Sequence, residues 1–262
     1  MTPARWKAVN AVGLVVVIAL NGLAATGAMS GQSIGALANQ YRSLFLPANY
    51  VFGIWSLIYA GLLGSLVWQL WPGASSRRAV ERLGIWWTVE GTLNVAWITV
   101  FSFAWFGTAL LVMLVFLASL ILVGERVRQP AADGTPPSWG DRLFVTWPQD
   151  LYLAWISVAV IANSFQYAHV IGFGGFGIPE ATWAVGMMGV ATLLGMLMAY
   201  AKGNWSFPFV VAWALYGIGD RYADLPTIGS AVDWLVPGGI GLGLVAWGAG
   251  TWTRRPKRAV AA

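Results

Sequence analysis

The chain has 262 residues, of which 58% are hydrophobic and only 10% are charged, whereas about 25% of residues are charged in an ordinary soluble domain. It contains no cysteine, which excludes disulfides, thiolate metal sites and cysteine nucleophiles. The net charge of +5 comes from basic residues clustered between long apolar runs. This placement predicts contact with a lipid bilayer and no binding of nucleic acid.

Eight apolar runs in chain order are each near the roughly 20 residues that a helix needs to span hydrocarbon. The runs are continuously apolar rather than alternating, which argues against a membrane barrel. They predict an all-α fold, a polytopic membrane helix bundle with about eight transmembrane helices. The predicted spans are residues 8–29, 49–71, 84–103, 106–123, 147–165, 181–201, 205–219 and 234–252.

Three of these spans carry further signals. The first is longer than the 7–15 apolar residues of a signal-peptide core, so we interpret it as an uncleaved span. Only Ala104 and Trp105 separate the third span from the fourth, which predicts a tight helical hairpin. The seventh is short and contains Pro208, which disfavours a regular helix interior.

The lysines and arginines predict the orientation of the chain, because cytoplasmic loops carry an excess of these residues. With the N-terminus inside, thirteen of the fifteen basic residues fall in inside segments, and only Arg42 and Arg221 fall outside. We therefore expect a multi-pass protein of the inner (cytoplasmic) membrane with both termini in the cytoplasm. The basic tail, residues 254–258, fits a lipid-headgroup anchor.

Many of the 17 tryptophans lie at span ends, as the aromatic-belt rule predicts. Trp55, Trp97 and Trp155 instead lie inside spans. Several indoles together form a flat, apolar and polarisable wall. Such a wall suits a planar aromatic or tetrapyrrole ligand, and it suits ordinary helix packing equally well.

Three predicted helix faces carry polar and aromatic residues at helical spacing. Polar side chains in hydrocarbon normally face the protein interior, so we expect these faces to converge around a space of the kind that holds small molecules. The predicted ligand-binding residues are Phe52, Trp55 and Tyr59 in the second span, Glu90, Asn94 and Trp97 in the third, and Trp155 and Asn163 in the fifth.

A structural interpretation of the polar members stays open. Asn94 and Asn163 fit interhelical hydrogen bonds as well as a ligand site. Glu90 lies about 9 Å from the inner end of its span, where it is protonated, paired or in reach of interfacial water. We predict no catalytic residues and no metal site, because His169, the one histidine, is predicted to lie in an external loop without a second base or nucleophile.

At these residues the sequence resembles the TspO/MBR family, the tryptophan-rich sensory or translocator proteins. Residues 46–59 (Leu-Pro-Ala-Asn-Tyr-Val-Phe-Gly-Ile-Trp-Ser-Leu-Ile-Tyr) resemble the second-helix signature, approximately Pro-Pro-x-x-x-Phe-x-x-x-Trp-x-x-Leu-Tyr. Residues 93–97 (Leu-Asn-Val-Ala-Trp) resemble the third-helix signature Leu-Asn-x-x-Trp. Tyr152, Trp155 and Asn163 resemble the fifth-helix pattern. The resemblance covers roughly the first 165 residues.

The resemblance implies a five-helix bundle, often dimeric, that binds porphyrins and other hydrophobic ligands between its helices. No cofactor is required, and a tetrapyrrole is the implied ligand. We therefore predict a TspO-like core in residues 1–165 and three additional helices with the basic tail in residues 166–262. Small residues at four-residue spacing, such as Gly239 and Gly243, predict close packing of these helices on the core or on another subunit.

The sequence departs from the family in the first inter-helix loop, which helps to cover the pocket in relatives. The usual Trp-Tyr pair is missing, Tyr41 is the one aromatic that corresponds, and Pro47 stands alone. The ligand is therefore left open. The leading hypothesis is a sensory or regulatory membrane protein that binds a planar hydrophobic molecule. The alternatives are a small-solute transporter and an accessory subunit of a larger membrane complex, with homo-oligomers or complex partners.

Overall fold

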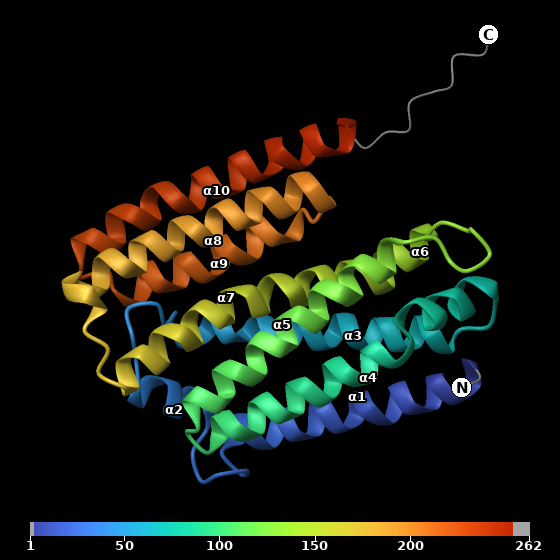
Figure 1. Ribbon diagram of the computed structural model, residues 1–262, viewed down its shortest axis with the longest axis horizontal. Coiled ribbons are helices and arrows are strands. Elements are labelled where there is room, and N and C mark those ends of the chain that lie inside the picture. The colour runs from blue at the N-terminus through green and yellow to red at the C-terminus, as the bar shows by residue number, and fades with distance from the viewer. Residues whose placement is uncertain (1–2, 254–262) are drawn as a thin grey trace.

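The computed structural model describes residues 3–253, and the regular secondary structure within that range consists of helices. Long helices occupy all eight of the predicted positions, which confirms the polytopic helical bundle (Figure 1). The long helices are α1 (Pro3–Thr26), α3 (Ile54–Leu70), α4 (Ala74–Ser102), α5 (Phe106–Arg128), α7 (Trp147–Val170), α8 (Glu180–Lys202), α9 (Ser206–Arg221) and α10 (Pro226–Thr253). The basic tail, residues 254–258, lies outside the described residues.

Short helices fill the connections. The shorter elements are α2 (Ile34–Gln40), η1 (Asn49–Gly53), α6 (Trp139–Asp141), η2 (Arg142–Thr146) and η3 (Gly175–Gly177). Ser33 caps α2, because its hydroxyl accepts a hydrogen bond from the backbone N–H of Ala36 at 3.2 Å. Segment α2 and the chain up to η1 lie across one end of the bundle (Figure 1).

Six helical segments of the described chain are long and apolar enough to cross a membrane by length and composition. They contain α1, α3, α5, α7, α8 and α10. Helix α9, with 16 residues, is about 24 Å long, which is shorter than the roughly 30 Å of hydrocarbon in a typical bilayer. Pro208 lies in its first turn, where the missing N–H needs no helical partner, so α9 runs on without interruption.

Helix α4 begins ten residues before the predicted third span. Its first turns carry Arg77, Arg78 and Arg82 and therefore do not belong to the apolar run from which the span was predicted. Gly84 interrupts the helix with φ 52 and ψ −139, a conformation that glycine adopts at little steric cost. The charged segment before Gly84 is thus a separate helical piece that meets the apolar span at a kink.

The prediction that His169 lies in an external loop is wrong. Helix α7 continues to Val170 and holds His169 in its last turn. The apolar run ends near Phe165, but the backbone hydrogen bonds continue for one more turn, up to the glycine-rich segment that begins at Gly172.

Helices α1, α3, α4, α5 and α7 pack on one another, and α8, α9 and α10 form a second group that joins them mainly through α7 and α9. Glycines allow the close approach within the second group. A Cβ on Gly243 would lie 2.6 Å from the Pro208 ring, and one on Gly239 would lie 3.0 Å from Thr192 Cγ2. The predicted small-residue packing therefore joins α10 to α8 and α9.

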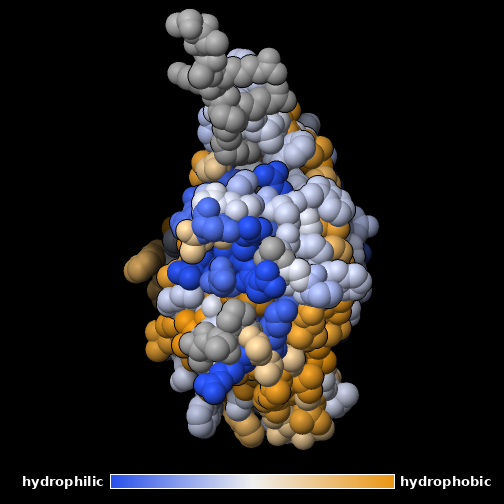
Figure 2. All heavy atoms as spheres, turned by 90° about the vertical axis from the view of Figure 1, so that its right-hand side faces the viewer, coloured by the Kyte–Doolittle hydropathy of each residue, from blue (hydrophilic) through white to orange (hydrophobic). Residues whose placement is uncertain are grey.

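One end of the bundle is hydrophilic. Helix α1 begins there, α5 and α8 end there, and α10 also ends there (Figure 1). Figure 2 looks at this end and shows blue, hydrophilic side chains gathered on it, with apolar surface on the flanks. The opposite end carries α2 and the connection to η1.

Candidate functional site

A cavity of about 560 Å³ lies between α1, α3, α4 and α7. Residues 33–53, from Ser33 through η1 and called the lid below, cover its end away from the hydrophilic face. The volume falls within the roughly 300–1,000 Å³ of small-molecule sites. No charged side chain of the described chain lines it. Six of the eight predicted binding residues line the cavity, namely Phe52, Trp55, Tyr59, Trp97, Trp155 and Asn163.

Trp55 stands at the centre of an aromatic wall. Its ring stacks on Tyr59 with centroids 5.5 Å apart and on Trp97 at 6.1 Å, with interplanar angles of 21° and 23°. Trp155 meets Trp55 edge-on, at 6.3 Å and 86°, and also meets Phe52 edge-on, at 6.1 Å. Two indoles from different helices thus lie nearly parallel, and a third closes the wall at right angles.

Polar side chains from α4 and α7 meet at the wall of the cavity. Trp97 Nε1 donates to Asn163 Oδ1 at 3.4 Å, and Asn163 Nδ2 donates to the carbonyl of Ala159 at 3.0 Å. Among the residues that line the cavity, two buried donors lack a partner, the Nε1 of Trp155 and the Nε2 of Gln166. These side chains are 3% and 6% exposed, and both residues line the cavity. Since buried donors are normally paired, the site suits a ligand that carries hydrogen-bond acceptors.

Asn94 lies behind the wall of this cavity and is fully buried. It accepts a hydrogen bond from Asn21 Nδ2 at 2.6 Å and donates to the Tyr152 hydroxyl at 2.7 Å. Its amide therefore joins α1, α4 and α7. In the structure Asn94 makes interhelical contacts, while Asn21 lines the cavity itself.

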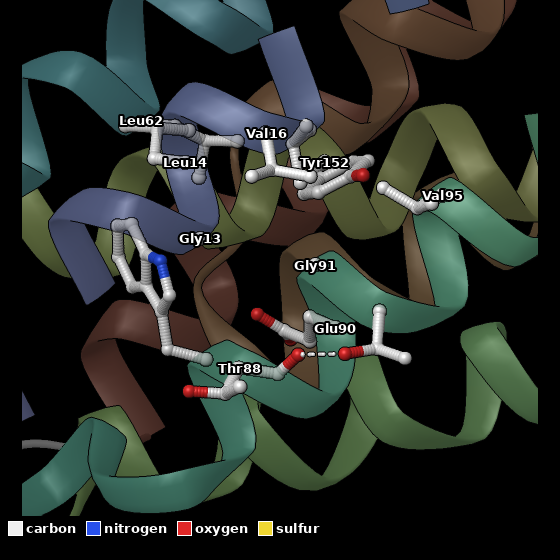
Figure 3. Close-up of a pocket in the computed structure, with 12 residues that line it drawn as sticks. Gly13, Leu14, Val16, Leu62, Thr88, Glu90, Gly91, Val95 and Tyr152 are labelled. Atoms are coloured by element: carbon white, nitrogen blue, oxygen red, sulfur yellow. Dashed lines mark hydrogen bonds between the residues drawn. The ribbon is translucent and has the colours of Figure 1, made fainter. Parts of the chain in front are cut away.

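Glu90 lies in a separate cavity of about 210 Å³ between α1 and α4, which Tyr152 also lines. Its Oε2 accepts a hydrogen bond from Gln149 Nε2 at 3.2 Å, while its buried Oε1 has no partner. Figure 3 shows Glu90 and Thr88 facing Leu14 and Val16 across this space. The structure thus separates Glu90 from the six residues that share the larger cavity.

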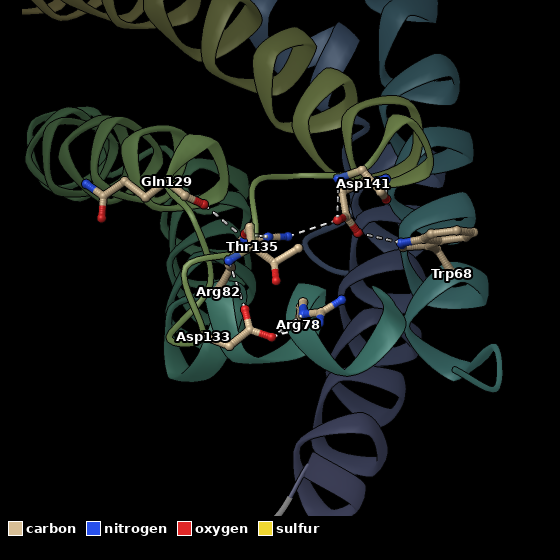
Figure 4. A network of polar contacts seen from close by, with 8 residues as sticks. Trp68, Arg78, Arg82, Gln129, Asp133, Thr135 and Asp141 are labelled. Carbon is tan, nitrogen blue, oxygen red and sulfur yellow. Dashed lines mark hydrogen bonds and ion pairs between the residues drawn. The ribbon is translucent and has the colours of Figure 1, made fainter. Parts of the chain in front are cut away.

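A third polar cluster lies at the hydrophilic end, outside both cavities (Figure 4). Arg82 and Asp141 form an ion pair at 2.9 Å, and both side chains are 4% exposed. Trp68 Nε1 donates to the second carboxylate oxygen at 2.9 Å, and Arg82 also donates to the carbonyls of Gln129 and Thr135. This cluster fastens the loop between α5 and α6 and is structural.

The sequence interpretation missed several lining residues, among them Asn21, Tyr41, Ser56 and Gln166. Asn21 and Asn10 are the two asparagines of the apolar run in α1 and stand eleven residues apart, which places them on one helix face. That spacing was a usable signal. Within the described residues, no group of three or more His, Asp or Glu side chains could hold a metal ion.

The model of a family described as TSPO-like protein matches residues 7–245. No curated protein and no solved structure matches the chain. The match extends beyond residue 165 through α8, α9 and most of α10, so the likeness covers more of the chain than the three short signatures. The division into a core and an added unit stays a prediction. The chain belongs to the family of TSPO-like proteins.

Proposed function

We propose that this membrane protein binds a planar hydrophobic molecule of the tetrapyrrole class in the cavity between α1, α3, α4 and α7, in a sensory or regulatory role. The observation that carries the proposal is the parallel pair Trp55 and Trp97, which borders a space of about 560 Å³ without charged side chains. An aromatic ring system gains both apolar burial and offset stacking against such a wall. The unpartnered donors of Trp155 and Gln166 complement acceptor atoms on the ligand.

The proposal includes an orientation. The protein lies in the inner membrane with its hydrophilic end in the cytoplasm, because basic residues gather in cytoplasmic segments. Arg77, Arg126, Arg142 and Lys202 belong to this end, and all four are exposed. The lid then lies on the opposite side of the membrane, where a ligand would enter or leave.

The test is a titration of the detergent-purified protein with protoporphyrin, followed by tryptophan fluorescence. We expect saturable quenching at one site. The variants Trp55→Phe and Trp97→Phe keep an aromatic ring and remove part of the stacking area, which should weaken affinity by about 2- to 10-fold. The matched control is Trp71→Phe, because Trp71 is 61% exposed at the end of α3 and does not line the cavity.

Non-saturable quenching would reject the proposal, and so would equal affinity in the cavity variants and the control variant. Circular dichroism of each variant shows whether the helical fold is retained. A loss of binding that accompanies a loss of helicity is therefore not counted as support.

A second candidate function, proton-coupled movement of a small solute, is favoured by Glu90. Its unpartnered carboxyl oxygen lies in a cavity at membrane depth, and ionisable groups at such depth often mark proton pathways. Proteoliposomes loaded with a pH-sensitive dye test this candidate. Proton flux that Glu90→Gln abolishes would favour transport, and wild-type vesicles without flux would count against it.

A further inference from the structure

We propose that the C-terminal helices act on the cavity through the lid, and that Arg221 and Tyr222 are positioning residues that set how readily the lid opens. The part of this inference that concerns ligand exchange rests on the proposed function. The lid itself, residues 33–53, carries nearly half of the residues that line the cavity, among them Ala38, Leu46 and Asn49.

Six hydrogen bonds of 2.6–3.1 Å join the lid to α8, α9 and the residue that follows α9. Two of them come from one guanidinium group, since Arg221 Nη2 donates to Asn39 Oδ1 at 2.6 Å and to Asn49 Oδ1 at 3.0 Å. Asn39 Nδ2 donates to the same Asn49 oxygen at 2.9 Å. Arg221 therefore ties α2 to the start of η1, which are the two ends of the lid.

Tyr222 fastens the middle of the lid. Its hydroxyl donates to the carbonyl of Ser43 at 2.6 Å, and the side chain is 7% exposed. Burial raises the pKa of the Tyr222 hydroxyl, so it keeps the proton that it donates. One residue further along the lid, the backbone N–H of Leu44 donates to Glu180 Oε1 at 2.7 Å.

Helix α9 supplies the remaining two bonds. The backbone N–H of Ala48 donates to the carbonyl of Gly217 at 2.9 Å, and Trp213 Nε1 donates to the carbonyl of Val51 at 3.1 Å. Against the first group of helices (α1, α3, α4, α5 and α7) the lid makes apolar contacts. One example is Phe45 on Phe165 of α7, with ring centroids 5.3 Å apart. These hydrogen bonds thus come from the C-terminal side of the lid, whereas apolar packing comes from both sides, since Tyr50 also packs on Trp213 of α9.

Apolar packing tolerates small displacements, whereas hydrogen bonds weaken steeply as they lengthen or bend. The lid therefore closes over the cavity in a position that α8 and α9 define. Removal of an anchor should raise the fraction of open lid and speed both entry and exit of a ligand, because the walls of the cavity stay in place. Two charge-assisted bonds at Arg221 predict a larger effect than the single neutral bond at Tyr222.

The test needs no ligand in its first arm. Since the chain has no cysteine, Ala38→Cys introduces a single thiol at a lid position that lines the cavity and is 3% exposed. The rate of its labelling by a water-soluble maleimide reports lid opening. We expect Arg221→Ala to raise this rate by roughly 10-fold or more and Tyr222→Phe by roughly 2- to 10-fold. Arg221→Lys, which keeps the charge, should restore part of the protection.

Lys202→Ala is the matched control. Lys202 pairs with Glu125 at 2.7 Å and so ties α8 to α5, but it does so at the hydrophilic end, away from the lid. A change that merely loosened the packing of the C-terminal helices would appear in this variant too. Its labelling rate should equal that of the parent Ala38→Cys protein.

The second arm measures association and dissociation rates of protoporphyrin by stopped-flow quenching in the same variants without the added thiol. Both rates should rise in Arg221→Ala and Tyr222→Phe and stay unchanged in Lys202→Ala. Equal labelling in all variants would overturn the anchoring role, and so would rapid labelling of the parent. Faster labelling together with unchanged protoporphyrin rates would overturn the role in ligand exchange. Faster labelling of a protein that binds no protoporphyrin would leave the anchors standing and reject the proposed function alone.

Discussion

The amide nitrogen of Asn21 lies 2.6 Å from Oδ1 of Asn94, and this bond joins α1 to α4 at the inner boundary of the larger cavity. Both side chains are buried, and Asn21 Nδ2 also donates to the carbonyl of Val17 at 2.8 Å. The pair thus fixes how closely α1 approaches α4, the helix that carries Trp97 of the aromatic wall.

A double-mutant cycle of Asn21→Ala and Asn94→Ala should give a coupling energy of about 0.6–2 kcal/mol, the range for interhelical hydrogen bonds in membranes. The measurement is the free energy of unfolding in detergent micelles titrated with SDS. Additive single-variant effects would contradict an interaction between the two amides. Asn39→Ala is a suitable control partner, because Asn39 lies in the lid and bonds to Asn49 and Arg221 instead.

Asp141→Ala should lower the free energy of unfolding by about 3–5 kcal/mol, because it leaves the buried Arg82 guanidinium without its ion pair. The same measurement on Lys202→Ala should show a loss of about 0–1 kcal/mol, since that pair is partly exposed and is screened by water. Similar losses in the two variants would show that the ion pair in Figure 4 gains little from its burial.

The ionisation of Asp133 should make the stability of the fold depend on pH in the acid range. Hydrogen bonds from the side chain and backbone of Thr135, together with Arg78, lower the pKa of this carboxyl to about 2. A depressed folded-state pKa adds stability above the unfolded value of about 3.9 and loses it as the pH falls through the folded value. Asp133→Asn should therefore unfold at a lower temperature than wild type at pH 6, and the gap should close between about pH 4 and pH 2. A gap of constant size over that range would contradict this account.

Gly217→Ala should destabilise the fold by about 1–3 kcal/mol, the usual effect of overpacking. A Cβ at this position would clash with Val51 Cγ2 and would lie 3.4 Å from Pro47 Cβ, so the Val51 side chain would have to move. The double variant Gly217→Ala/Val51→Ala should recover much of the loss. Gly186→Ala in α8 is the control, because a Cβ there meets nothing within 4 Å. The measurement is the thermal unfolding of wild type and of these three variants. A double variant no more stable than Gly217→Ala would contradict the proposed clash.

The apolar runs and the aromatic spacing predicted much of this arrangement. Trp55, Trp97 and Trp155 lie on three helices and meet at one cavity because helical spacing determines which face each residue occupies. The same spacing did not predict that Glu90 lines a separate cavity, because a shared helix face does not imply a shared depth. Glu90 lies one turn, about 6 Å, before Asn94 along α4, and the contacts of Asn94 with Asn21 and Tyr152 separate the two cavities.

The anchors of the lid could not be predicted from sequence patterns. Arg221 and Asn39 are 182 residues apart, and neither belongs to a periodic motif. The count of basic residues grouped Arg221 with Arg42, and in the structure Arg221 lies against the lid that contains Arg42, but the count gives no partner. Such contacts depend on how α9 packs against α7 and η1, and hydropathy does not determine that packing.

The lid is synthesised well before the C-terminal residues that anchor it. All four helices that wall the cavity have been synthesised once residue 170 is made, but Arg221 is added 51 residues later. At about 5–20 residues per second, the lid therefore stays without this anchor for on the order of 3–10 s after the last wall helix has been made. The nascent chain therefore holds an aromatic-walled chamber whose cover is made but not yet fastened by the C-terminal residues.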